Sequence, residues 1–208
     1  MTNTPTAKGA RKRTQLLDTA EELLLATGHA GLSMRAVATA ADIRLGNLQY
    51  YFPTRADLVA AVLDRALAHS LERLRPLLSS PGSPTAPDPE RVVRALLAEQ
   101  DDPRLVRLFA ALWAMAALDE AVAAAVRAFY RAYQDQVAAF LHARRPDLST
   151  AQCRSRAGVF TMLIEGASLF RSGIADHRTQ ETDAELVAMA VGMLGGSGPV
   201  AVDAARRG

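Results

Sequence analysis

The chain has 208 residues, which is room for one domain of ordinary size or for a small head on a larger body. Half of its residues are apolar and 22% are charged, as is usual for globular proteins that bury a core, and the formal net charge of +2 does not by itself indicate a nucleic-acid partner. Residues 1–58 carry seven Lys/Arg against five Asp/Glu, whereas residues 59–208 carry seventeen of each. The basic excess therefore lies at the front, in an arm with Lys8, Arg11, Lys12 and Arg13, which either binds phosphate or is simply solvated.

Cysteine usage and hydropathy limit the class of protein further. Cys153 is the only cysteine, so an intrachain disulfide and a thiolate metal cluster are excluded, and a reducing compartment is favoured. The first residues are polar and basic and do not resemble a signal peptide, and the most apolar segments, such as residues 105–118, are too short to span a bilayer. We therefore expect a cytoplasmic protein.

The hydrophobic pattern predicts an all-α protein, because Ala, Leu, Arg and Glu dominate and no run alternates with the period of a strand. Start and stop signals divide the chain: Gly28 ends the first helix, Ser33 caps the second, Pro53 and Thr54 separate the third from the fourth, and Ser149 caps the eighth. About nine helices are predicted, at residues 11–27, 34–41, 45–51, 55–74, 89–100, 103–117, 119–145, 149–175 and 182–195.

These helices predict four parts in the chain. We expect a basic disordered arm at residues 1–10, a helix-turn-helix DNA-binding domain at 11–56, a helical regulatory and dimerisation domain at 57–195, and a flexible tail at 196–208. A proline-rich loop is predicted at 78–89.

The most informative segment is residues 32–58, where two short helices are joined by a tight turn, as in a helix-turn-helix. Ile43, Leu48 and Phe52 have the spacing of core residues. Gly46 costs the second helix roughly 1 kcal/mol relative to Ala, which is reasonable where a backbone must approach a phosphate. The outward positions are expected to be Arg44, Gly46, Asn47, Gln49, Tyr50 and Tyr51.

The same segment resembles the signature of TetR-family repressors. Residues 41–58 spell ADIRLGNLQYYFPTRADL, and the family closes its recognition helix with a Gly-(Thr/Asn)-Leu-x-x-(Tyr/His)-Phe run. Residues 32–38, LSMRAVA, are similar to the family's second helix. The resemblance covers about residues 11–60, and beyond it the chain is similar only in helix number and length. It implies an N-terminal three-helix helix-turn-helix domain followed by a larger helical ligand-binding and dimerisation domain.

The resemblance also implies roles for individual residues. Asn47 and Tyr51 would hydrogen-bond phosphates, and Arg55, where the family usually has Lys, would do so from the start of the fourth helix. Ser33 and Arg35 are further candidates for contacts with the DNA backbone.

Base recognition is assigned to Arg44 and Gln49, whose forked side chains suit guanine and adenine edges respectively. Leu45 and Gln49 depart from the family pattern, which has a basic or small residue and a Tyr there, and Leu45 is suited to packing on a thymine methyl group. For Tyr50 two interpretations are equally supported: a contact with DNA and a position in the core.

The last two long helices are the candidates for a subunit interface. Small residues interrupt large ones in residues 149–175, and residues 182–195 have an apolar face. The resemblance implies that the two helices pair with their copies as a four-helix bundle; the alternative is that they only line the core of one protomer. The expected interface residues are Phe160, Leu163, Phe170, Leu186, Met189 and Met193.

A ligand pocket is expected between the fourth helix and the helices at 103–175, although at least half of its candidate residues are expected to be ordinary core. Glu165 stands in an apolar stretch and is either a ligand anchor, a partner for Arg171 or Arg127, or a charge at the interface. The candidate pocket residues are Phe109, Trp113, Met115, Phe129, Tyr130, Tyr133, Met162 and Glu165.

Together these features predict a ligand-responsive, sequence-specific transcriptional regulator. We expect a homodimer that binds a palindromic double-stranded DNA operator, represses, and is released by a small molecule, without cofactor, metal or membrane. An enzyme is disfavoured because the four histidines are scattered and no nucleophile or phosphate-binding motif is present. Two alternatives remain: a redox-responsive regulator that uses Cys153 beside Arg154 and Arg156, and a helical small-molecule-binding protein without enzymatic activity.

Overall fold

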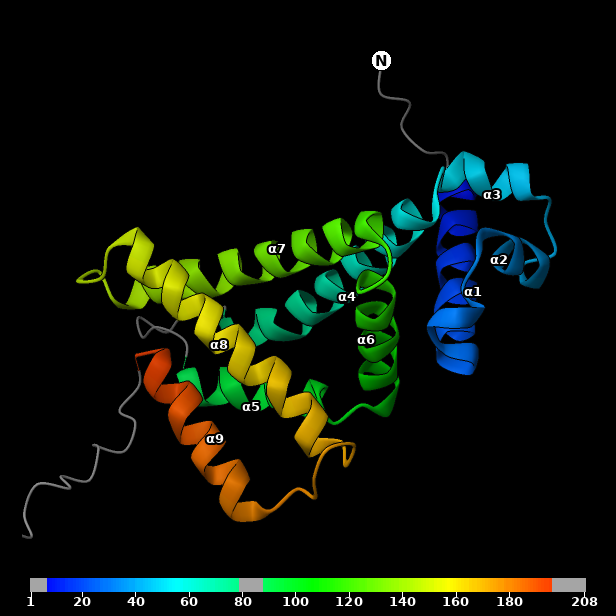
Figure 1. Ribbon diagram of the computed structural model, residues 1–208. Coiled ribbons are helices and arrows are strands. Elements are labelled where there is room, and N and C mark those ends of the chain that lie inside the picture. Colours follow the sequence, from blue (N-terminus) through cyan, green and yellow to red (C-terminus); the bar gives the residue numbers. More distant parts are fainter. Residues whose placement is uncertain (1–6, 79–87, 196–208) are drawn as a thin grey trace, which may run out of the picture. The chain divides into compact units, whose positions relative to one another are not determined.

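The computed structural model describes residues 7–78 and 88–195 of the chain. These residues form nine α-helices and no strand, so the all-α prediction is confirmed. No helix in the described ranges has the length and apolar character needed to cross a membrane. The helices are α1 (Ala7–Gly31), α2 (Met34–Ala40), α3 (Leu45–Tyr51), α4 (Arg55–Leu78), α5 (Pro89–Glu99), α6 (Pro103–Ala116), α7 (Glu120–Arg144), α8 (Thr150–Arg171) and α9 (Gln180–Met193) (Figure 1).

Most helix starts lie where the sequence places a capping residue. Ser33 Oγ accepts a hydrogen bond from the Ala36 backbone N–H at 3.1 Å. Ser149 and Gln152 form a reciprocal capping box at the start of α8. The backbone N–H of Asp57 donates to Thr54 Oγ1 at 3.1 Å, which fixes the start of α4. These local hydrogen bonds satisfy N–H groups that the first turn of a helix leaves without a partner.

The first helix differs from its prediction at both ends. It begins at Ala7, so residues 7–10, which were assigned to a disordered arm, are helical. Gly28 has φ 66° and interrupts the helix as predicted, but helical geometry resumes as far as Gly31. A Cβ at Gly31 would lie 1.8 Å from Thr27 Oγ1, so only glycine fits there. Residues 1–6, most of the proline-rich loop (79–87) and the predicted tail (196–208) lie outside the described residues.

The chain divides into two compact units. The first comprises residues 1–68 and 104–130, and its described part contains α1 to α3, the first part of α4, α6 and the beginning of α7. One apolar core runs through these helices, with Leu16, Leu48, Leu58, Leu112 and Val122 all fully buried. The helix-turn-helix therefore shares its core with α6 and α7.

The compact units do not follow the expected boundary between residues 56 and 57. Residues 57–68 and 104–130 pack with the helix-turn-helix because α4 and α6 supply part of its core. The predicted division by role, DNA binding against regulation, stays a prediction.

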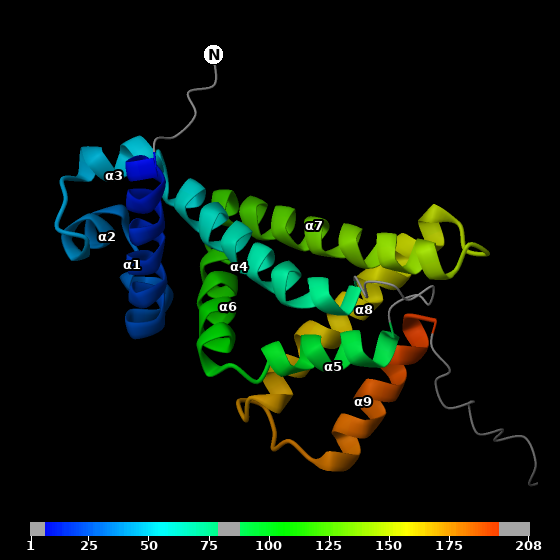
Figure 2. The same cartoon turned by 180° about the vertical axis from the view of Figure 1, so that it is seen from behind.

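The second unit comprises residues 69–103 and 131–208. In its described part α5, α8 and α9 lie side by side in both views (Figures 1 and 2). Its buried residues include Leu97 of α5, Leu141 of α7, Ile164 of α8 and Ala190 of α9. Apolar side chains from four helices thus form its interior.

Candidate functional site

Helices α2 and α3 form the predicted helix-turn-helix beside α1 (Figure 1). In the turn between them Asp42 has a left-handed φ of 50°, and the Ile43 backbone N–H donates to the Ala38 carbonyl at 2.9 Å. Val37 and Leu48 are fully buried. The buried side chains fix how both helices are rotated, and so decide which residues point outward.

None of the ten predicted DNA-binding residues is buried. Leu45, Tyr51 and Arg55 are half-buried and the other seven are exposed. Tyr50 is 79% exposed, so it does not belong to the core, and it stacks edge-on against Tyr51 at 5.2 Å between ring centroids. The seven exposed residues are Ser33, Arg35, Arg44, Gly46, Asn47, Gln49 and Tyr50.

Gly46 lies in the first turn of α3 with open space around it. A Cβ built there would meet no atom within 4 Å, so packing within the protein gives no reason for a glycine in this helix. The absence of a side chain exposes the α3 backbone to whatever approaches from outside.

Arg55, the first residue of α4, forms an ion pair with Asp119, 64 positions further along the chain. Its Nη2 donates to Asp119 Oδ2 at 2.9 Å. The other oxygen, Oδ1, accepts the backbone N–H groups of Ala121 and Val122 at the start of α7. The Val122 N–H and the Arg55 guanidinium stabilise the carboxylate and hold the pKa of Asp119 below its usual value.

A second ion-pair group joins α4 to α1. Arg65 Nη1 donates to Asp18 Oδ1 at 2.6 Å, and Arg65 Nε donates to Glu21 Oε1 at 2.9 Å. At the start of α1 the Arg13 guanidinium lies 5.1 Å from the centre of the Phe52 ring. Polar and cation–π contacts therefore add to the apolar core in holding α1, α3 and α4 together.

Four of the expected pocket residues come together in the first unit. Phe109 and Trp113 of α6 lie beside Phe129 and Tyr130 of α7, with ring centroids 5.4 Å apart for Phe109 and Phe129. Trp113 Nε1 donates to Tyr130 Oη at 2.9 Å, and all four side chains are half-buried. Met115 is 2% exposed and belongs to the core. We call the four aromatic residues the aromatic cluster.

The other three expected pocket residues belong to the second unit. Tyr133 is buried, and burial together with the charges of Glu165 and Glu99 raises its pKa. Met162 is 71% exposed and points away from the interior. Arg171 pairs with Asp101 and Asp183, and Arg127 pairs with Glu120. Glu165 is half-buried, and its role stays a prediction.

Helices α8 and α9 expose an apolar surface, which we call the α8–α9 face. Val159, Met162, Phe170 and Met189 are 54%, 71%, 53% and 60% exposed, respectively. A groove of about 490 Å³ between the helices is lined in part by Met162, Leu163, Gly166, Phe170 and Leu186.

The expected interface residues divide between this face and the interior. Phe170 and Met189 are exposed and Leu163, Leu186 and Met193 half-buried, whereas Phe160 is 1% exposed and belongs to the core of the protomer. Val159 and Met162 also lie on this face, although Val159 was in no expected set and Met162 was expected in the pocket. Their signal is the helical spacing 159, 162, 163, 166 and 170, which puts all five positions on one stripe.

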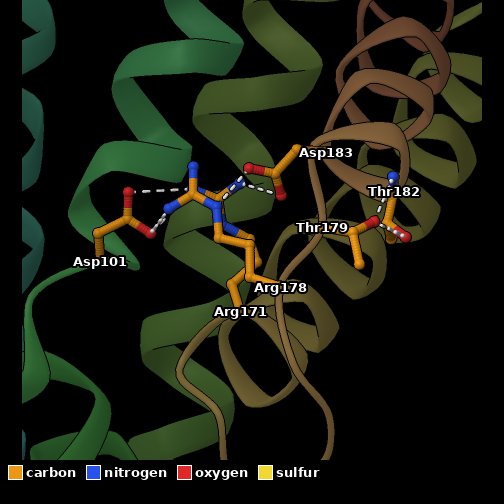
Figure 3. Close-up of polar contacts among 6 residues, drawn as sticks. All are labelled: Asp101, Arg171, Arg178, Thr179, Thr182 and Asp183. Atoms are coloured by element: carbon orange, nitrogen blue, oxygen red, sulfur yellow. Dashed lines mark hydrogen bonds and ion pairs between the residues drawn. The ribbon is translucent and has the colours of Figure 1, made fainter.

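An ion-pair network joins the end of α8 to the start of α9 (Figure 3). The Arg171 side chain is 7% exposed and donates to Asp101 at 2.8 Å and to Asp183 at 2.7 Å. Arg178 pairs with the same two carboxylates, and Thr179 caps α9 by accepting the Thr182 N–H at 3.1 Å. The network links the end of α8 and the start of α9 to the turn after α5, so it fixes the geometry of the α8–α9 face.

The burial of Cys153 disfavours the redox alternative. Cys153 is 1% exposed, which keeps oxidants from its thiol. Within residues 7–78 and 88–195 no group of three His, Cys, Asp or Glu side chains is placed to hold a metal ion.

The N-terminal part of the chain is similar to known bacterial regulators. Residues 16–62 match the model of the family described as bacterial regulatory proteins, tetR family. The chain is 35% identical over 125 residues to an HTH-type transcriptional regulator in the dhlA 5′ region of Xanthobacter autotrophicus, a match that spans 58% of this chain and 60% of that protein. Residues 16–62 therefore match the TetR family, in agreement with the sequence signature at residues 32–58.

Solved structures show the same fold. GusR of Salmonella enterica aligns with a TM-score of 0.73 at 18% identity, over 92% of this chain and 100% of its own. The multidrug binding protein EbrR, crystallised with imidazole, aligns with a TM-score of 0.62 at 25% identity, over 86% of this chain and 94% of its own. The family and its relatives are regulators rather than enzymes, which agrees with the expectation that the chain has no catalytic site.

Proposed function

We propose that the chain is a ligand-responsive repressor that binds a palindromic operator as a homodimer and is released by a small molecule. The single observation that carries this proposal is the outward face of α3. Its exposed positions carry polar, aromatic or glycine residues, while its inward Leu48 is fully buried. A helix with this division of faces suits the major groove of DNA.

On this proposal the helix-turn-helix residues divide into two groups. Arg44 and Gln49 contact base edges, with Leu45 beside them for a thymine methyl group. Asn47, Tyr51 and Arg55 bind phosphates and set the position of α3 in the groove. Ser33 and Arg35 contact the backbone from the start of α2, where Ser33 Oγ already accepts the Ala36 N–H and has its hydroxyl hydrogen left to donate.

The α8–α9 face is the proposed dimer interface. Its exposed apolar side chains would lose contact with water if the same face of a second copy covered them. Gly158 and Gly166 support this arrangement, because a Cβ at either position would meet no atom within 4 Å and a partner helix has room to approach closely. A two-fold dimer presents two α3 helices to two half-sites, which explains a palindromic operator.

The aromatic cluster is the proposed contact for the effector. EbrR has been crystallised with malachite green and with imidazole, both aromatic molecules, and its fold is similar to that of this chain. Phe109 and Trp113 lie on α6, which shares its apolar core with the helix-turn-helix. A ligand that separates these rings would move α6 and with it the recognition helices, and this differential binding of two states releases DNA.

The direct test is a mobility-shift assay of the protein on the DNA upstream of its own gene, at two salt concentrations. We expect a specific shift that weakens with salt and is lost in the Asn47→Ala/Tyr51→Ala double variant. Thr39→Ala, an exposed position on α2 outside the proposed contacts, is the matched control and should bind like the parent. A double variant that binds as tightly as the parent contradicts the proposal.

A further inference from the structure

We propose that Asp119 weakens DNA binding through Arg55. Its ion pair with the Arg55 guanidinium competes with a DNA phosphate, so the contact between Arg55 and DNA depends on the position of the turn between α6 and α7. Asp119 is thus a positioning residue, since it acts through Arg55 and does not touch DNA. The inference rests on the proposed function, in which Arg55 is a phosphate ligand.

The two carboxylate oxygens of Asp119 accept hydrogen bonds from different partners. Oδ1 caps α7 by accepting the N–H groups of Ala121 at 3.0 Å and Val122 at 3.2 Å. Oδ2 accepts from Arg55 Nη2 at 2.9 Å. Capping of α7 does not require the bond to Arg55, so the pair is an additional contact between the start of α4 and the start of α7.

The pair joins two points that the apolar core already holds in place. Leu58 of α4, Leu112 of α6 and Val122 of α7 are fully buried in one core. Asp119 lies between α6 and α7, three residues before the buried Val122, and Arg55 lies three residues before the buried Leu58. A displacement of α6 or α7 therefore changes the distance between the carboxylate and the guanidinium.

Charge explains the direction of the effect. Arg55 and Asp119 have side-chain exposures of 35% and 33%, so water only partly screens the pair. Among the described residues Asp119 is the polar partner of Arg55. A guanidinium neutralised in this way attracts a phosphate less than a free one, and it must give up part of the ion pair when it binds DNA.

A double-variant cycle tests the inference by fluorescence anisotropy on a short labelled duplex of arbitrary sequence, because phosphate contacts also act on non-specific DNA. The four proteins are the parent, Asp119→Asn, Arg55→Ala and the double variant. Asn retains the capping oxygen and removes the charge. We expect Asp119→Asn to bind about fivefold more tightly, the upper end for an exposed ion pair, and to raise the salt slope by up to about 0.9.

The Arg55→Ala background provides the decisive comparison. There Asp119→Asn should change affinity less than twofold, because the side chain through which Asp119 acts is missing. An equal gain in both backgrounds would mean that Asp119 only repels DNA as a nearby charge, and weaker binding by Asp119→Asn would mean that it orients Arg55 for binding; either result overturns the inference.

Two further variants separate this inference from the proposed function. Asp147→Asn breaks a similar pair with Arg145 in the second unit and should leave DNA affinity unchanged. Asn47→Ala/Tyr51→Ala should weaken binding to the same duplex. If it does not, the proposed DNA surface is wrong; if it does and the cycle shows no coupling, only the role of Asp119 is wrong.

Discussion

The outward face of α3 and the α8–α9 face both contain helical glycines in open space and exposed large side chains, yet their chemistry differs. On α3 and its N-cap the exposed side chains are Arg44, Asn47, Gln49 and Tyr50, all able to form hydrogen bonds. On α8 and α9 they include Val159, Met162, Phe170 and Met189, which are not. We therefore expect a partner at each of these two exposed faces. The side chains indicate its chemistry: DNA, a hydrated polyanion, for α3, and a second apolar face for α8 and α9.

The largest expected effect follows from a charge placed on the apolar face. Met162→Glu would bury an unpaired carboxylate twice in a two-fold dimer, at a cost of at least about 3 kcal/mol. We expect monomers in sedimentation velocity and roughly hundredfold weaker operator binding. Ala139→Glu, at an exposed position of α7, is the control and should remain dimeric. A dimer that survives Met162→Glu would place the interface elsewhere.

The next largest effect tests whether the helix-turn-helix and α6 share one core. Leu112→Ala in α6 removes a fully buried side chain and should lower the free energy of unfolding by about 3 kcal/mol. Thermal unfolding should then show α3 and α6 melting together. The fluorescence of Trp113 reports on α6, and hydrogen exchange of the Leu48 amide reports on α3. If the Leu48 amide keeps its protection, the helix-turn-helix folds independently of α6.

The smallest effects compare glycines of the two faces. Gly46→Ala and Gly166→Ala should each stabilise a helix, by up to about 1 kcal/mol, because a Cβ meets nothing within 4 Å at either position. Gly46→Ala should weaken DNA binding and leave dimerisation unchanged, and Gly166→Ala should do the reverse. Titration calorimetry on a duplex and sedimentation equilibrium measure the two effects separately. Equal effects of both substitutions on both measurements would remove the distinction between the faces.

The helices could be predicted from the sequence because their signals are local. Ser33, Thr54 and Ser149 accept hydrogen bonds from N–H groups within three residues of themselves, and α2 and α3 lie within one residue of their predicted ends. Five of the six residues expected to point outward around α3 are exposed, because the core residues Leu48 and Phe52 fix the rotation of the helix, whereas Tyr51 is half-buried and packs against the core.

The remaining features depend on contacts between distant residues. Phe160 and Met162 are two residues apart on α8, and only the packing of α8 against its neighbours decides that the first is buried and the second exposed. The pair of Arg55 with Asp119 joins residues 64 positions apart, and spacing within one helix gives no signal for such a contact. Sequence pattern identifies a helix, but the rotation of an apolar helix within a core is a tertiary property.

The measurement that tests the account most directly is selection of duplexes from a random pool by the purified protein, because it needs no knowledge of the operator. The account predicts an enriched inverted repeat, with half-sites one helical turn or a whole number of turns apart, one for each α3 of a dimer. Arg44→Ala should select a repeat with relaxed preference at one position of each half-site. Enrichment of a single asymmetric site, or no enrichment at all, would contradict the account.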